Sequence, residues 1–198
     1  MKRFIQKQLL LLVAVLSATI TASAYGFGVD GIYYNITSDV DKTCSVTYPQ
    51  YGHDYSGSIN IPSTVAYNNT SYTVTGIGYR AFEDCDNLTS VTIPNSVTTI
   101  GSFAFEGCSS LTSVTIPNSV TTIGSSAFYD CTNICDLTIG AGIISIGNEA
   151  FSYYDYRTTY IDIEKVIWLP NTPPKGYSEI NGYRNYVAND SYSELDNV

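Results

Sequence analysis

A repeat of 23 residues constrains the fold of this chain more than any other feature. Residues 86–108 and 109–131 are identical at 18 of 23 positions. The same spacing separates the Ala-Phe pairs that begin at Ala81, Ala104, Ala127 and Ala150. A fixed period of roughly 20 to 30 residues indicates a solenoid, in which each unit buries its apolar face only against its neighbours.

The first half of a unit predicts a short strand. One unit reads L-x-x-V-x-I-P-x-x-V-x-x-I-G-x-x-A-F-x-x-C. Within residues 88–93 the apolar positions alternate with polar ones, as in a strand that is buried on one face. We therefore expect Val91 and Ile93 to point inward, and Ser90 and Thr92 to point outward. The equivalent strands of the next two units lie near 114–116 and 137–139, so the three should form one parallel sheet.

The second half of a unit returns the chain to the core. Pro94 cannot donate a hydrogen bond to a neighbouring strand, so the strand should end there. Val97 and Ile100 then turn inward again. We expect Gly101 to adopt a backbone conformation that a β-carbon would resist.

The unit ends in a turn that should carry a ring and a thiol into the core. Ala104 and Phe105 predict one short helical turn, with Phe105 filling the space behind the strand. Cys85, Cys108 and Cys131 occupy the last inward position of successive units and should form a buried column. A disulfide between neighbours is conceivable. Reduced thiols are the favoured reading, because buried cysteine packs as a small apolar residue and three residues cannot all pair. The sequence leaves open the redox state of Cys44 and Cys135.

The repeat resembles those of a known bacterial family. The motif Ile-Pro-Asn-Ser-Val-Thr-Thr-Ile-Gly at residues 93–101, with the later Ala-Phe-x-x-Cys, is similar to the leucine-rich repeats of BspA-like surface proteins and of treponemes. We accordingly expect a right-handed superhelix with parallel strands on its concave face and short helical or irregular turns on its convex face. The resemblance also implies display outside the cell and adhesion to host matrix or to other bacteria.

The ends of the array depart from the repeat. Residues 25–58 predict an N-terminal β-hairpin cap, with strands at 32–36 and 44–48 around a polar turn at 38–42. The array should run over residues 59–170. From Val65 to the next pattern position, Ile77, there are 12 residues where later units have three, so an insertion lies near 66–74.

A second insertion is expected near 152–160, after which the strand pattern resumes. Ile163, Val166 and Trp168 match the three apolar strand positions and would turn Trp168 inward. An alternative register aligns Leu169 with Ile93 and turns Trp168 outward. Residues 171–198 are polar and predict a C-terminal cap or a partly ordered tail.

Residues 1–24 predict a signal peptide. Lys2, Arg3 and Lys7 precede a short apolar run, and Ala22-Ser-Ala24 is typical of a cleavage site; an uncleaved membrane anchor is the alternative. Cleavage leaves six basic and 18 acidic residues, a formal charge of −12. Such a charge argues against nucleic acid and anionic membranes as partners. We expect a secreted or cell-surface protein without membrane insertion after cleavage.

No pattern in the sequence indicates catalysis, a metal site or a cofactor. His53 is the only histidine and lies in a polar loop, and no known nucleophile, phosphate or zinc motif is present. We therefore expect a binding protein rather than an enzyme. A structural spacer in a surface assembly is the alternative, and an extracellular hydrolase is a more remote one.

Two surfaces are candidates for the partner, an extracellular protein or a glycan. The first is the outward row of the strands, with Thr92, Thr115 and Thr138. The second comprises the tyrosines of the two insertions, because tyrosine gives a large contact area at low conformational cost: Tyr67, Tyr72, Tyr153, Tyr154, Tyr156 and Tyr160. In the alternative reading these tyrosines only close the ends of the solenoid. The sequence does not name the ligand or choose between the surfaces.

Overall fold

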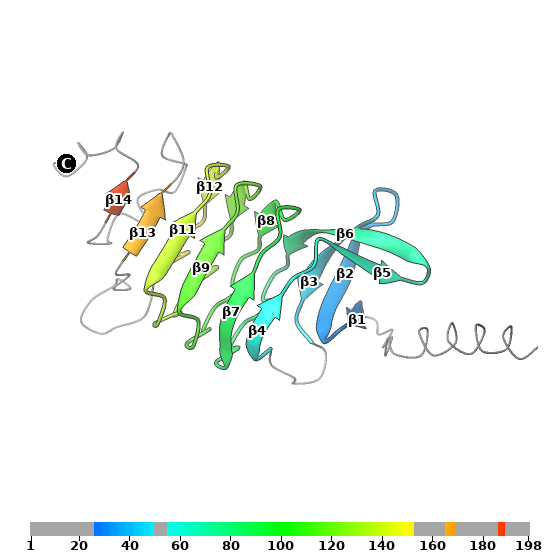
Figure 1. The fold of residues 1–198 in the computed structure, drawn as a ribbon, viewed down its shortest axis with the longest axis horizontal. Helices are drawn as coiled ribbons and strands as arrows, with labels where there is room; N and C mark the ends of the chain where they lie inside the picture. Colours follow the sequence, from blue (N-terminus) through cyan, green and yellow to red (C-terminus); the bar gives the residue numbers. More distant parts are fainter. Residues whose placement is uncertain (1–25, 50–54, 153–164, 169–185, 189–198) are drawn as a thin grey trace, which may run out of the picture.

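The computed structural model describes residues 26–49, 55–152, 165–168 and 186–188, the last two segments by their backbone only. These residues form strands joined by turns, and contain no helix (Figure 1). The strands are β1 (Phe27–Val29), β2 (Ile32–Ser38), β3 (Thr43–Thr47), β4 (Gly57–Asn60), β5 (Thr64–Tyr67), β6 (Thr70–Ile77), β7 (Leu88–Thr92), β8 (Thr99–Ile100), β9 (Ser113–Ile116), β10 (Thr122–Ile123), β11 (Asp136–Ile139), β12 (Ser145–Ile146), β13 (Lys165–Trp168) and β14 (Tyr186–Ala188).

The first strands of most units pair in parallel with a neighbouring strand, as expected. β9 pairs with β11 so that Val114 faces Leu137 and Ile116 faces Ile139, and β13 and β14 extend this sheet. The burial also follows the predicted alternation, since Val91 and Ile93 are buried while Thr92 is exposed. The strands β4, β7, β9, β11 and β13 follow one another along the molecule in Figure 1.

The row of long strands is interrupted between β7 and β9. β7 pairs with β4, whereas no ladder joins it to β9 among the described strands. The expectation of one sheet through all three strands is therefore wrong at this point. Pro117 removes one possible bond, because its counterpart in the following unit, Gly140, donates its N–H to the carbonyl of Ile116 at 2.9 Å and proline has no N–H. It does not by itself explain the break, since Pro94 occupies the same position after β7 and β7 still pairs with β4.

A second sheet was not predicted. The Thr-Ile pairs at 99–100, 122–123 and 145–146 are the short parallel strands β8, β10 and β12, and β8 pairs with β6. The glycine that follows each pair is needed for a different reason from the one expected. A β-carbon on Gly101 would lie 2.8 Å from the carbonyl carbon of Gly78 in the preceding unit. Close stacking of units therefore selects glycine here.

The N-terminal cap contains the expected hairpin and one additional strand, β1. β2 and β3 pair antiparallel with Ile36 opposite Cys44, and β1 adds a third strand that was not predicted. β3 also pairs in parallel with β6, so the cap is hydrogen-bonded to the second sheet. The insertion near 66–74 forms the β5–β6 hairpin, whose turn places Asn68 and Asn69 at φ of 48° and 59°.

The turns behind the strands are not helical, which corrects the expected helical turn at Ala104 and Phe105. The N–H of Phe105 donates to the carbonyl of Ala127 in the next unit at 2.7 Å, and Phe82 makes the same bond to Ala104. Phe103 has a φ of 59°, outside the right-handed helical region. Hydrogen bonds between units thus replace the bonds that a helix would form within one unit.

The predicted core columns are confirmed. Successive rings of Phe82, Phe105, Phe128 and Phe151 stack with centroids 4.8 to 5.2 Å apart and planes within 6° of parallel. Cys85, Cys108 and Cys131 are buried beside them as thiols. Tyr55 covers the first ring at 4.6 Å and donates its hydroxyl to the carbonyl of Thr47.

The C-terminal strand pattern follows the first of the two registers. Val166 pairs with Leu137, and Trp168 pairs with Ile139, the third apolar strand position. The direction of the Trp168 side chain lies outside what the structure describes. The expected signal peptide at 1–24, His53, and most of the second insertion and of the C-terminal segment also lie outside the described residues.

Candidate functional site

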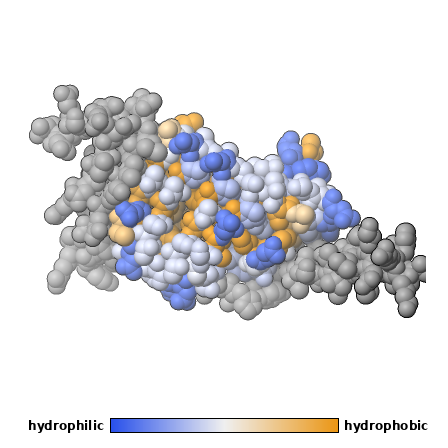
Figure 2. Space-filling view, viewed as in Figure 1, coloured by the Kyte–Doolittle hydropathy of each residue, from blue (hydrophilic) through white to orange (hydrophobic). Residues whose placement is uncertain are grey.

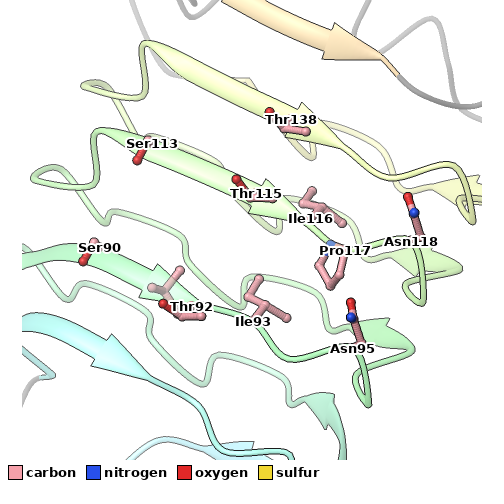
Figure 3. Close-up of a pocket in the computed structure, with 11 residues that line it drawn as sticks. Ser90, Thr92, Ile93, Asn95, Ser113, Thr115, Ile116, Pro117, Asn118 and Thr138 are labelled. Carbon is pink, nitrogen blue, oxygen red and sulfur yellow. The ribbon is translucent and has the colours of Figure 1, made fainter.

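A groove with a volume of about 580 Å³ opens where β7 and β9 fail to pair (Figure 3). Both flanking strands contribute to it, together with the turns that follow them and one side chain of β11. The lining residues are Ser90, Val91, Thr92, Ile93, Asn95, Ser113, Thr115, Ile116, Pro117, Asn118 and Thr138. The break in the sheet therefore creates the hollow on this face.

The groove combines apolar residues with uncharged polar ones. Val91, Ile93, Ile116 and Pro117 supply the apolar part. Figure 2 shows hydrophobic residues in a band across this face of the molecule, with hydrophilic residues scattered around it. None of the described residues that line the groove carries a charge. A ligand here would meet apolar contact and neutral hydrogen-bonding groups, which is the usual composition of a binding site.

Strand alternation brings the three predicted threonines together. Thr92, Thr115 and Thr138 come from β7, β9 and β11 and project from the same face of the strands (Figure 3). Within the part of the chain that is described, their hydroxyls have no hydrogen-bond partner. By contrast, Ser90 donates to Ser58 at 2.7 Å.

Sequence reasoning missed the residues just beyond the strands. Asn95 and Asn118 follow the two prolines and line one end of the groove (Figure 3). The Asn118 side-chain oxygen accepts the N–H of Ala141 at 2.8 Å, so it also ties two units together. The Pro-Asn pair that follows each of the two strands was the available signal, because a proline marks the point where the chain leaves the strand.

The structure places the first pair of predicted tyrosines in the β5–β6 hairpin, next to the N-terminal cap. Tyr72 is 5% exposed and donates its hydroxyl to the carboxylate of Asp39 at 2.7 Å. Tyr67 is half-buried and stacks on Phe27 with ring centroids 4.2 Å apart. The hairpin folds the Tyr72 ring onto the end of the core. This burial supports the reading that these two residues close the array.

The tyrosines of the second insertion are not placed relative to the groove. Tyr153, Tyr154, Tyr156 and Tyr160 lie outside the described residues. Their assignment to partner binding stays a prediction from the sequence.

The thiols of the cysteine column are buried, and two of them donate hydrogen bonds to the backbone. The Cys108 thiol donates to the carbonyl of Phe82 at 3.1 Å, and the Cys131 thiol donates to Phe105 at 2.9 Å. The adjacent Cys131 thiol and burial raise the pKa of Cys108 far above its ordinary value. Burial raises the pKa of Cys44 to about 11. The Cys108 and Cys44 thiols therefore stay protonated at neutral pH, whereas a thiol must ionise to act as a nucleophile or metal ligand. No cluster of three metal-ligating side chains occurs among the described residues.

Comparison with known families identifies the repeat. The family described as BspA type Leucine rich repeat region matches residues 57–167, in six copies. The chain belongs to this BspA-type leucine-rich-repeat family. The match starts at the first residue of β4 and reaches into β13, so it covers the stacked units and leaves the β1–β3 cap outside.

Solved bacterial structures share the leucine-rich-repeat fold. The chain is similar to a leucine-rich cell surface protein from Faecalibacterium prausnitzii, with 27% identity and a TM-score of 0.52 over 78% of this chain. It spans only 43% of that protein. A leucine-rich repeat protein from Bacteroides capillosus has 28% identity and a TM-score of 0.53, over 69% of this chain and 97% of that one. The leucine-rich repeat protein of T. pallidum, at 20% identity over 69% of this chain and 68% of that one, shares the fold with a TM-score of 0.50.

No curated protein matches the sequence of this chain significantly. Among the residues that the structure describes, no helix has the length and hydrophobicity needed to span a membrane.

Proposed function

We propose that this leucine-rich-repeat protein is a secreted or cell-surface binding protein, and that the groove between β7 and β9 holds part of its partner. The observation that carries the proposal is the break in an otherwise parallel row of strands. It leaves a hollow that is lined by apolar side chains and bordered by threonine hydroxyls. The partner is an extracellular protein or a glycan, because the groove lacks the positive charge that nucleic acid requires.

We infer that the stacked units form a right-handed solenoid with β7, β9 and β11 on its concave side. Connections between parallel strands of one sheet are right-handed in about 98% of cases, which supports this path. A concave strand face would let one partner contact several units at once. A crystal structure with a left-handed path would contradict the inference.

The proposal includes export by residues 1–24 and the absence of catalytic activity. N-terminal sequencing of the secreted protein tests the first, and a panel of hydrolase substrates tests the second. Adhesion to host matrix is the specific role that the family resemblance favours. A rigid spacer in a surface assembly is the alternative, in which the protein would bind none of the matrix or glycan partners.

Blocking the groove tests its role. Purified protein would be screened against matrix glycoproteins and glycans, and the strongest partner titrated against Thr115→Arg. A long charged side chain on β9 should fill the groove and weaken binding by about tenfold or more, because a buried unpaired charge opposes contact. Thr99→Arg is the matched control, since Thr99 is also an exposed threonine but lies on β8 in the other sheet.

The two variants separate the outcomes. Weaker binding by Thr115→Arg alone, with both variants folded, supports the groove. Equal binding by both variants places the contact elsewhere. Failure of every partner on the panel to bind the unmodified protein favours the spacer.

A further inference from the structure

A partly exposed cluster of two rings and a guanidinium lies on turns whose residues do not line the groove. We call Tyr79, Arg80 and Phe103 the aromatic–arginine platform. The Arg80 guanidinium carbon lies 5.2 Å from the ring centroid of Tyr79 and 5.3 Å from that of Phe103. The two rings meet edge to face, with centroids 5.8 Å apart. Tyr79 is 57% exposed, so the platform presents aromatic surface to solvent.

Stacking of the units does not require these rings. Phe103 occupies the position of Ser126 in the following unit, and Tyr79 that of Ser102. The core position of the turn is already filled by Phe105, which is fully buried. Phe103 has a φ of 59°, but Ser126 and Glu149 share this conformation at the same position of later units, so it belongs to the turn. A large, partly exposed ring where the next unit carries serine points to a role other than folding.

Acidic residues outnumber basic residues around the platform. Arg80 is the only lysine or arginine between Lys42 and Arg157. Its Nη1 is already engaged by the carboxylate of Glu83, at 2.9 Å. Glu106 lies in the next turn close to Glu83, and burial together with that neighbour raises the pKa of Glu106. Asp84 and Asp86 add two more exposed acidic groups. The surface therefore presents aromatic rings and carboxylates to a partner, and its one cationic side chain, Arg80, is already paired with Glu83.

We propose that the aromatic–arginine platform, with Glu83 and Glu106, binds a lysine- or arginine-containing segment of another protein. A partner cation can lie against the exposed face of Tyr79, since aromatic faces attract cations. The same cation can neutralise the Glu83 and Glu106 carboxylates, which repel each other when both are ionised. Charge complementarity over a chain with a formal charge of −9 favours a basic partner and speeds its approach. This surface is separate from the groove, and neither proposal depends on the other.

The test uses a fluorescein-labelled synthetic peptide of alternating lysine and serine, with fluorescence anisotropy as the readout. The variants Phe103→Ser and Tyr79→Ser install the residue that the neighbouring unit carries at the same position. Glu106→Gln removes one charge and keeps the shape. Each should weaken peptide binding by about fivefold, the size expected of one cation–ring or charge contact. Asp136→Asn, an equal loss of charge on β11, should change binding less than about twofold.

Melting temperatures show whether each variant is folded. If a serine variant does not fold, the Glu106→Gln variant still tests the proposal. Three results overturn the proposal. In the first, Asp136→Asn weakens binding as much as Glu106→Gln, which indicates diffuse attraction to a polyanion. In the second, a glutamine–serine peptide binds as well as the lysine–serine peptide, which indicates a neutral partner. In the third, folded Phe103→Ser and Tyr79→Ser bind the peptide like the unmodified protein.

Discussion

At the scale of single residues, two phenylalanines on the same turn have opposite roles. Phe105 is fully buried in a column of parallel rings whose spacing of about 4.8 Å is set by the distance between stacked strands. Phe103 is half-exposed and lies against Arg80. The sequence predicts the first because Ala-Phe recurs in every unit. For Phe103 the sequence shows only that the following unit carries serine at the same position.

The burial of Phe105 predicts a large loss on truncation. Phe105→Ala should lower the free energy of unfolding by about 3–5 kcal/mol, because it opens a cavity between Phe82 and Phe128. Phe103→Ala should cost less than about 1 kcal/mol, since its ring is half-exposed. Urea denaturation of the two variants measures both. Similar losses would mean that the inward face of the turn has been assigned incorrectly.

The environment of Glu106 predicts a dependence on pH. Its pKa in the folded protein is raised above the ordinary value of 4.5, mainly by burial and then by Glu83. The folded state therefore holds this proton more tightly than the unfolded chain does, and the contribution to stability falls as pH rises through the raised pKa. Glu106→Gln should raise the melting temperature at pH 7 and leave it unchanged at pH 3.5. An equal rise at both values would contradict the assignment.

At the scale of elements, apolar periodicity fixes which residues lie inside but not which strands pair. Val91, Val114 and Leu137 were all assigned inward, and all are buried. The missing ladder between β7 and β9 was not predictable, because near-identical units predict identical pairing. The short strands were also missed, since two residues are too few to show a period. The prediction of a helical turn was wrong, because the sequence pattern of one unit does not show the hydrogen bonds between units.

Pro117 offers a direct test of the break. Pro117→Gly copies Gly140 of the following unit and restores an N–H opposite the carbonyl of Ile93. The new amide should form that bond and exchange slowly with solvent. The net change in stability should stay within about 1 kcal/mol, because the added hydrogen bond is offset by the flexibility of glycine. Amide exchange followed by NMR checks this. A rapidly exchanging amide at position 117 would show that proline does not contribute to the break.

At the scale of the whole molecule, the stacked units need a cover at each end. The β1–β3 cap and the β5–β6 hairpin close one end, where Tyr55, Tyr67 and Tyr72 pack against the core. The sequence predicted a hairpin there from its loss of period. It could not predict that β3 would join the second sheet, because that pairing depends on the inserted hairpin. The candidate threonines came from alternation alone, whereas the groove they line required the three-dimensional break.

The central claim is that the partner binds in the groove between β7 and β9. Hydrogen–deuterium exchange of the protein, with and without the strongest partner from the binding screen, tests it most directly. We expect slower exchange on binding in peptides that cover β7, β9 and residues 94–96 and 117–119, with no change in β8, β10 and β12. Protection confined to the short strands, to the N-terminal cap or to the tyrosine-containing segment at 153–160 would contradict the claim.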